Sequence, residues 1–268
     1  MSRLIPAGQG AVLPLAACLG PVAALALAAH SALASPLIRV PAGSFLMGES
    51  TALCGDDERP VTLTRDFELS TTEVTNAEYL AALEWARAQG RVLLSGARVL
   101  DVASGQTLLE LGSWYAEIQF DGAHFFLRQS PYALASAYPG GYDPATHPVV
   151  KVSWYGAAAF CNWRSELDGL PPAYDPVTFV CNGGDPYGAR GDGRGWELRR
   201  STLERTHRPG EAAADCALAN RPAAATVGWT SPMGSHPEGA SALGFVDMGG
   251  NVGEWTNDWW SCERGTAR

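Results

Sequence analysis

A glycine-rich loop near the end of the chain places two acidic residues where they could serve a cation. The loop, Gly244–Trp260, reads GFVDMGGNVGEWTNDWW, and its glycines and Asn251 tolerate the positive φ angles that a tight bend requires. Asp247 and Glu254 lie on either side of that bend, so their carboxylates could turn toward one point. The alternative is a solvated acidic turn in which Asp247 caps its own backbone.

The other residues that could do chemistry are scattered. The sequence contains no H-E-x-x-H and no C-x-x-C, so it indicates neither a zinc protease nor a thioredoxin-like or zinc-ribbon site. Ser44 and Ser153 have no nucleophile-elbow context, and Ser153 is explained as the N-cap of a helix. No i, i+4 pair occurs among His124, His147, His207 and His236.

The composition is that of an acidic globular protein. With 268 residues, of which 46% are hydrophobic, the chain can bury the core of one domain or of two small ones. Its formal net charge is −9, its isoelectric point is near 5.0, and Lys151 is its only lysine. No cluster of basic residues offers a stripe for phosphates, so the sequence predicts no nucleic-acid binding.

The N-terminal segment has the pattern of an export signal. Arg3 supplies positive charge, residues 11–29 form an apolar run, and Ala32-Leu33-Ala34 fits a small-residue cleavage site. We therefore expect residues 1–34 to be a signal peptide, and the exported protein to be periplasmic, envelope-associated or extracellular. A second interpretation takes the Leu-Ala-Ala-Cys stretch at 15–18 as a lipoprotein box with a lipid anchor on Cys18.

Cleavage after Ala34 would leave an odd number of cysteines. An exported location favours disulfides, so most of these thiols are expected to pair. An odd number leaves at least one thiol without a partner inside the chain. The cysteines concerned are Cys54, Cys161, Cys181, Cys216 and Cys262.

Two helices are marked by the residues at their ends. Thr75 and Glu78 have the spacing of a capping box, which predicts a helix from Thr75 to about residue 89, with Gly90 as the C-terminal stop. A second helix is predicted to begin after Ser153 and to end at Gly169, and apolar residues recur along it at helical spacing.

The remaining regular structure is predicted to be β-rich. Residues 38–50 read as two strands around a turn, and residues 61–69 alternate apolar and polar positions like one half-buried strand. Residues 91–128 are expected to form an inserted β region, in which Asp121-Gly122 is a good hairpin turn. Strands and helices in this order predict an α+β fold.

Four blocks of the sequence resemble the formylglycine-generating enzyme family, also called sulfatase-modifying factors. The blocks follow the family's order, and they lie at residues 40–48, 61–79, 147–163 and 227–260. The last block resembles the family's G-L-Y-D-M-x-G-N-V-W-E-W-T-x-D-W stretch. The resemblance implies an irregular, loop-rich α+β fold related to C-type lectins, formed by residues 35–268.

Calcium is the cofactor that the resemblance implies. In the family this loop binds Ca²⁺ through two side chains and two backbone carbonyls, which correspond here to Asp247 and Glu254 and to Gly250 and Val252. Ca²⁺ takes six to eight oxygen ligands in flexible geometry, which suits carboxylates beside carbonyls that glycines leave free to turn. In relatives the site is structural and not catalytic.

The chain departs from the family pattern in three places. The family's R-L-P-T-E-A-E-W-E stretch has no counterpart at 197–210, and Gly253 stands where relatives carry a core tryptophan. The family's R-G-G-S-W strand and its two copper-binding cysteines have no match, so the domain is expected to be incomplete at its C-terminal end and to bind no copper. The usual disulfide partner of Cys161 would lie in that same region.

Two functions and one alternative origin are consistent with these patterns. By resemblance, the exported protein would oxidise a cysteine of a sulfatase, or of another protein substrate, to formylglycine. The lack of matching copper cysteines favours instead a non-catalytic, calcium-stabilised binding or envelope protein on the same fold. A damaged or truncated reading frame is the third hypothesis. Because the copper cysteines have no match, the resemblance assigns no catalytic residue to this chain.

Overall fold

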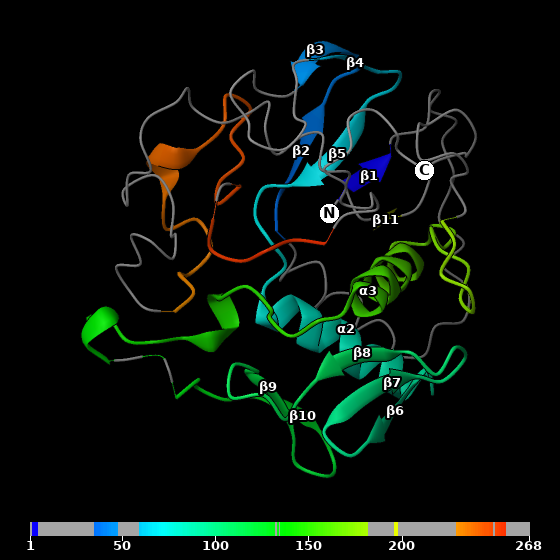
Figure 1. Cartoon of the computed structure of the whole chain (residues 1–268), viewed down its shortest axis with the longest axis vertical. Helices are drawn as coiled ribbons and strands as arrows, with labels where there is room; N and C mark the ends of the chain where they lie inside the picture. Colours follow the sequence, from blue (N-terminus) through cyan, green and yellow to red (C-terminus); the bar gives the residue numbers. More distant parts are fainter. Residues whose placement is uncertain are drawn as a thin grey trace.

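The computed structural model of the chain describes residues 35–47, 59–131, 133, 135–181, 229–248 and 250–255, together with two short strands at 2–4 and 196–197. The rest of the predicted signal peptide lies outside the described residues, as do Cys18, Cys54, Cys216 and Cys262 and most of the departing stretch at 197–210. Within the described residues, two α-helices lie among small antiparallel sheets and long irregular connections (Figure 1). The fold is therefore α+β and loop-rich, as predicted.

The first long helix, α2 (Asn76–Ala88), begins with the predicted capping box. The Thr75 hydroxyl accepts a hydrogen bond from the Glu78 backbone N–H at 3.1 Å, and the Glu78 carboxylate accepts one from the Thr75 N–H at 2.8 Å. The helix ends at its C-cap, Gln89, and Gly90 follows with a φ angle of 69°. The left-handed conformation that ends this helix favours glycine, which explains the residue found there.

The second long helix, α3 (Trp154–Leu167), is capped by Ser153 as predicted. The Ser153 hydroxyl accepts a hydrogen bond from the Gly156 N–H at 3.0 Å and donates one to the Thr107 carbonyl at 2.5 Å. These bonds tie the start of α3 to strand β8 (Thr107–Glu110). A Cβ at Gly156 would overlap the Leu108 carbonyl group, so the close approach of helix and strand requires glycine.

The region 91–128 is filled by strands. A three-stranded antiparallel sheet is followed by a hairpin that turns through residues 121–124. The sheet consists of β6 (Val92–Ser95), β7 (Arg98–Asp101) and β8, and the hairpin consists of β9 (Ile118–Phe120) and β10 (Phe125–Leu127). The main core lies between these strands and the two helices, and the Tyr79 and Phe160 rings stack there at 5.4 Å.

The prediction of one strand over 61–69 is wrong. The segment contains two strands, β4 (Arg59–Leu63) and β5 (Phe67–Ser70), which pair with different partners. Between them Asp66 accepts hydrogen bonds from the Ala42 N–H at 2.7 Å and from the Arg39 guanidinium. This corner ends the alternation of the side chains and lets the chain change from one sheet to the next.

The partners of these strands come from the start of the described chain. β4 pairs with β3 (Gly43–Met47), whereas β5 pairs with β2 (Leu37–Val40) on one side and with β1 (Ser2–Leu4) on the other. β1 also pairs with β11 (Trp196–Glu197), giving a four-stranded sheet in the order β11-β1-β5-β2. Three residues of the predicted signal peptide therefore belong to this sheet. In the described residues, no helix is long and apolar enough to span a bilayer.

Replacing Gly156 by alanine should destabilise the fold. Alanine would gain roughly 1 kcal/mol of helix propensity, but its Cβ would overlap backbone atoms of β8 that no rotamer change can move. We expect a net loss of about 2 kcal/mol in the free energy of unfolding, measured by urea denaturation.

The exposed Gly140 provides the matched control for that change. A Cβ there meets nothing within 4 Å, so Gly140→Ala should change stability by less than ~0.5 kcal/mol. Equal stabilities for the Gly156→Ala and Gly140→Ala proteins would contradict the close packing of α3 on β8.

Candidate calcium loop and adjoining pocket

The acidic loop is anchored to the four-stranded sheet by one aromatic residue. Phe245 is buried and packs in a small cluster with Val40, Phe67 and Leu69, which come from β2 and β5. Next to it, the Val246 N–H donates a hydrogen bond to the Thr71 carbonyl at 3.1 Å. The loop is thereby fixed against the segment that leads from β5 into α2.

Asp247 points into the protein. It is only 5% exposed and has a φ angle of 60°. Its Oδ2 accepts a hydrogen bond from the Gly234 N–H at 2.7 Å, whereas its Oδ1 is buried without a hydrogen-bond partner. Burial raises the pKa of Asp247, and the Gly234 N–H and nearby His236 lower it only in part. An acceptor of this kind, buried and unsatisfied, is costly unless a proton or a cation accompanies it.

The other predicted ligand positions surround Asp247 at the surface. Gly250 and Val252 are half-buried, and Glu254 is exposed. Asn251 braces the loop, because its amide oxygen accepts from the Ser231 N–H at 2.7 Å and its amide nitrogen donates to the Ser231 carbonyl at 3.1 Å. The Gly250 N–H donates to the Asp247 carbonyl at 3.4 Å, so these two positions share a turn, while one of the two predicted carboxylates lies inside the protein and the other outside.

Sequence reasoning missed Glu73, a third carboxylate at this place. Glu73 is 7% exposed, and neither of its oxygens has a hydrogen-bond partner of normal geometry. The pKa of Glu73 is raised to about 9, chiefly by burial and then by the negative charges of Glu254 and Asp247, while its own backbone and Asn251 offset only part of the shift. No local signal marked Glu73, because the residues that make its environment, Asp247, Asn251 and Glu254, lie far along the chain.

No three side chains of His, Cys, Asp or Glu converge as a metal-binding group anywhere in the part of the chain that the structure describes. The acidic loop therefore differs from an all-side-chain metal cluster. Oxygens for a cation would have to come from backbone carbonyls as well as from the carboxylates. That combination is the ligand type that Ca²⁺ accepts.

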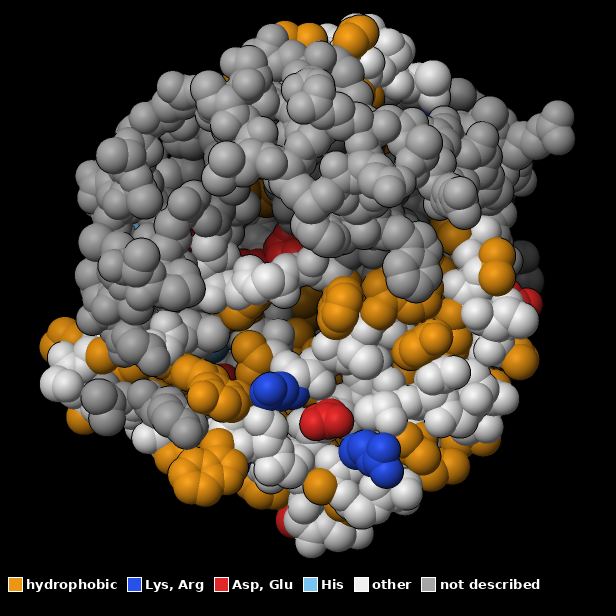
Figure 2. Space-filling view, viewed as in Figure 1, with side chains coloured by type: hydrophobic (Ala, Val, Ile, Leu, Met, Phe, Trp, Pro, Cys, Tyr) orange, Lys and Arg blue, Asp and Glu red, His pale blue; other side chains and the backbone are white. Residues whose placement is uncertain are grey.

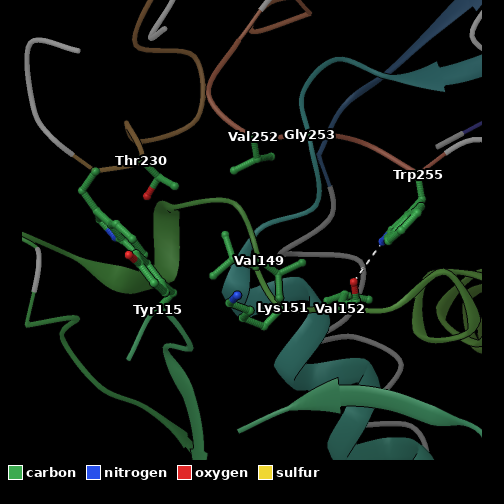
Figure 3. A pocket seen from close by; sticks show the side chains of 10 residues that line it. Tyr115, Val149, Lys151, Val152, Thr230, Val252, Gly253 and Trp255 are labelled. Carbon is green, nitrogen blue, oxygen red and sulfur yellow. Dashed lines mark hydrogen bonds between the residues drawn. The ribbon is translucent and has the colours of Figure 1, made fainter. Parts of the chain in front are cut away.

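A pocket of about 410 Å³ lies beside the loop and shares three of its residues, Val252, Gly253 and Trp255. Its floor is the segment 149–152, and its opposite sides are aromatic (Figure 3). Trp229 stacks on Tyr115 at 5.3 Å on one side. On the other side, the Trp255 indole N–H donates to the Val152 carbonyl at 2.9 Å. On the face shown in Figure 2, hydrophobic side chains lie along the lower edge of a hollow.

A buried carboxylate supports the Trp229 side of the pocket. Glu117 accepts hydrogen bonds from the Trp229 indole at 3.3 Å, from the Asn76 amide at 2.6 Å and from the Tyr142 hydroxyl. Burial is the main cause that raises the pKa of Glu117 to about 7, and the Trp229 and Asn76 donors offset part of that shift. Together they fix the orientation of the Trp229 ring.

His147 belongs to the same buried cluster. Its Nδ1 lies 2.8 Å from the Thr230 hydroxyl, and its ring packs against Tyr142 with 4.4 Å between the ring centroids. Burial lowers the pKa of His147 to about 4. These contacts give the neutral imidazole a structural role in the packing of this cluster.

Comparison with known proteins identifies the family. The sulfatase-modifying factor enzyme 1-like domain matches residues 24–268. The chain belongs to this family. A formylglycine-generating enzyme from Thermomonospora curvata is 23% identical over 254 residues, covering 86% of this chain and 74% of that protein. The chaperone protein LppX from Paenibacillus barcinonensis is 30% identical over 158 residues, covering 46% of this chain. The matched region spans only 56% of the length of LppX.

A solved structure gives the fold of this family member independently. The crystal structure of CarF superposes with a TM-score of 0.52 at 22% identity, covering 85% of this chain and 82% of that one. Similarity at this level supports the C-type-lectin-related fold predicted from the four sequence blocks, and the fold alone.

The cysteines of this family member are mostly outside the described residues. Cys161 is buried within α3. Cys181 is half-buried, and its backbone pairs with that of Tyr174 in an isolated antiparallel β-bridge. The predicted pairing of Cys161 with a residue beyond the last matched block therefore stays a prediction.

Glu117 should make the stability of the protein depend on pH. Its pKa is about 7 in the folded state against an ordinary value of 4.5, so its contribution to stability is fully present below about pH 4.5 and is lost as the pH rises through 7. We expect Glu117→Gln to remove this part of the pH dependence in urea denaturation measured across that range.

The exposed carboxylate Glu110 is the control for that experiment. Glu110→Gln should leave the pH dependence as it is in the unmodified protein. A Glu117→Gln protein whose stability falls with pH as steeply as before would contradict the elevated pKa of Glu117.

Proposed function

We propose that this chain is an exported, calcium-stabilised binding domain of the sulfatase-modifying factor family. The observation that carries the proposal is the burial of Asp247 and Glu73 with carboxylate oxygens that no hydrogen bond satisfies. Export is supported by the signal-like pattern of residues 1–34, with a lipid anchor on Cys18 as its variant. The protein would then work in the periplasm, at the envelope or outside the cell.

The residues present fit a calcium ion. Asp247 Oδ1 is the unsatisfied inner ligand, Glu254 is an exposed outer carboxylate, and Gly250 and Val252 would supply backbone carbonyls. Bound Ca²⁺ would neutralise the loop and hold its turn in place. The positive φ angles of Asp247 and Asn251 show that the turn is already shaped sharply around this point.

Glu73 would act with this site from the neighbouring segment. Burial is the main cause of the high pKa of Glu73, and repulsion from Glu254 and Asp247 adds to it. A divalent cation beside Asp247 would reverse that situation and favour the ionised form of Glu73. Calcium would therefore join the loop to the start of α2 as well as ordering the loop itself.

Formylglycine formation is the second candidate function. It is favoured by the alignment with the Thermomonospora enzyme over 86% of this chain, and a sulfatase or another protein would be the substrate. The name of LppX, a chaperone protein, favours protein binding without oxidation. Both candidates place a protein partner on the same fold.

Calcium should raise the thermal midpoint of the protein, and EDTA should lower it. Calcium at 100 times its Kd would stabilise the fold by ~2.7 kcal/mol, which corresponds to a rise of about 5–10 °C for a chain of this size. Asp247→Asn should remove most of this rise, as measured by differential scanning calorimetry. Glu238→Gln, an exposed acidic position in a 3-10 helix, should respond as the unmodified protein does. If the unmodified protein had the same midpoint in calcium and in EDTA, the result would contradict the proposed calcium site.

Glu73→Gln should affect the thermal midpoint differently in the calcium-free and the calcium-bound protein. Without calcium it should raise the midpoint near neutral pH, because glutamine removes a carboxyl group whose burial is unfavourable there. With calcium present, the substitution should reduce the rise in midpoint that calcium produces, because the attraction between ionised Glu73 and the cation is lost. A variant with an unchanged midpoint without calcium and a full calcium increment would show that Glu73 has no part in the site.

The enzyme candidate is tested directly with a cysteine-containing sulfatase peptide. The full chain, loaded with copper and supplied with O₂ and a reductant, should leave the peptide without an aldehyde that a hydrazine probe can label. The active Thermomonospora enzyme serves as the positive control. Aldehyde formation above that seen with copper alone would replace the binding proposal by the enzymatic one.

A further inference from the structure

We infer that the binding of one proton to Glu117 switches an aromatic wall of the pocket from a firmly held state to a loosened one. The wall consists of the stacked rings of Trp229 and Tyr115. Glu117 is only 1% exposed and contacts this wall from inside the protein. The switch concerns the pocket and needs no calcium in the loop, so it goes beyond the proposed function.

The ionised carboxylate of Glu117 is matched to its surroundings, because four groups donate to it. The Asn76 amide donates to one oxygen at 2.6 Å, and the Trp229 indole at 3.3 Å and the Tyr142 hydroxyl donate to the other. The fourth donor is the backbone N–H of Ser130. A carboxylate has about four lone-pair sites, so the ionised form uses its whole capacity to accept.

Protonation of Glu117 removes this match. A carboxylic acid donates one hydrogen bond of its own, but an indole N–H and a backbone N–H can only donate. The Asn76 amide cannot turn over to accept, because its nitrogen also donates to the Pro144 carbonyl at 3.0 Å. Of the four groups, only the Tyr142 hydroxyl can receive the acid proton. The hydrogen bond between Glu117 and Tyr142 must then reverse, and the hydrogen of the Tyr142 hydroxyl needs a different acceptor.

Trp229 responds directly to this reversal. Its indole nitrogen lies 3.0 Å from the Tyr142 oxygen as well as 3.3 Å from Glu117. Hydrogen bonds to a charged acceptor are about twice as strong as those between neutral groups, so the indole is held most firmly by ionised Glu117. In the acid form both acceptors are neutral, and Tyr142 already accepts the acid proton. The indole is therefore held less firmly, and so is the Tyr115 ring that stacks on it at 5.3 Å.

The pH at which the wall changes follows from the burial of Glu117. Burial is the main cause that raises its pKa to about 7, so the acid form is present below that pH and the ionised form above it. The other charged or titratable groups around the cluster and the wall are Arg128 after β10, Tyr138, Tyr142, Asp143 and His147 from the connection that leads to α3, and Lys151 from the floor of the pocket.

These neighbours leave the transition to Glu117. The positive charge of Arg128 favours the ionised form of Glu117 in part. Burial lowers the pKa of His147 to about 4 and raises that of Tyr138 to about 12, so neither changes its charge near pH 7. With the proposed export, the protein meets the pH of its surroundings. A partner in the pocket would then find a firm wall above about pH 7 and a loose one below it.

The indole N–H of Trp229 provides the test, and that of Trp255 is its internal control. In NMR spectra of the full chain with isotope-labelled tryptophan, Trp229→Phe and Trp255→Phe identify the two indole signals among those of the nine tryptophans. The Trp255 indole belongs to the same pocket, but it donates to the Val152 carbonyl, which has no proton to exchange. Its signal therefore reports any general effect of pH on the pocket.

We expect the Trp229 indole proton to move downfield by several tenths of a ppm as the pH rises through about 7, while the Trp255 signal stays in place. The midpoint should equal that of the Glu117 carboxyl carbon, observed with labelled glutamate. The nuclear Overhauser effect between the Trp229 and Tyr115 rings should be at least twofold weaker below the midpoint. A constant Trp229 signal in folded protein, or a ring contact that does not change with the signal, would overturn the inference.

Glu117→Gln and Glu110→Gln form a matched pair of variants. Glutamine at position 117 has no proton to exchange in this range, so the Trp229 signal should not depend on pH. Glu110 is exposed, and its variant should titrate like the unmodified protein. A Trp229 transition that persists in folded Glu117→Gln would contradict the inference. If that variant does not fold, unequal midpoints of Trp229 and the Glu117 carboxyl carbon in the unmodified protein would contradict it equally.

The titration is run both in calcium and in EDTA, which separates the switch from the calcium site. We expect the same Trp229 transition in both solutions, because Glu117 and its donors do not belong to the acidic loop. The calcium response of the thermal midpoint tests the proposed function by itself. A Trp229 transition that occurs only with calcium would contradict a switch made by Glu117 and its donors alone.

Discussion

Negative charge buried without a counter-ion is the constraint on which this structure depends. Glu73 and Asp247 lie inside the protein, and the acidic loop that holds Asp247 closes against the sheet through Phe245. Burying one unpaired carboxylate costs several kcal/mol unless its charge is neutralised. The chain supplies no lysine or arginine to these oxygens among its described residues. A proton or a bound cation must therefore compensate, and the loop has the backbone shape to hold a cation.

Glu117 shows a different solution to the same problem. This carboxylate is also buried, but the Asn76 amide, the Tyr142 hydroxyl and the Trp229 indole donate to it. Its pKa reaches about 7, with the Trp229 and Asn76 donors offsetting part of the burial, whereas that of Glu73, which also faces the charges of Glu254 and Asp247, reaches about 9. One carboxylate thus fixes an aromatic wall by its own bonds. Glu73 has no hydrogen-bond donors of this kind, so a proton or a bound cation must compensate for its burial.

Local signals in the sequence predicted the helices and failed where distant segments meet. Thr75 and Ser153 define the helix starts by bonds within a few residues, so capping patterns were sufficient. The break at Asp66 depends on Arg39 and Ala42, about 25 residues away, and the alternation of 61–69 contains no sign of it. Glu73 was missed for the same reason. Its environment is made by Asp247 and Glu254, which the sequence places far along the chain.

The loop and the pocket share a backbone, and this sharing connects their chemistry. Val252 and Gly253 line the pocket, while Gly250 and Val252 belong to the proposed calcium ligands. A cation that fixes the Val252 carbonyl would also fix the position of Gly253 and the direction in which Trp255 leaves the loop. Because the Trp255 indole donates a hydrogen bond to the Val152 carbonyl in the floor of the pocket, the loop and the floor are held together. A structural ion in this family member would therefore determine how well the pocket is formed, without itself touching a ligand.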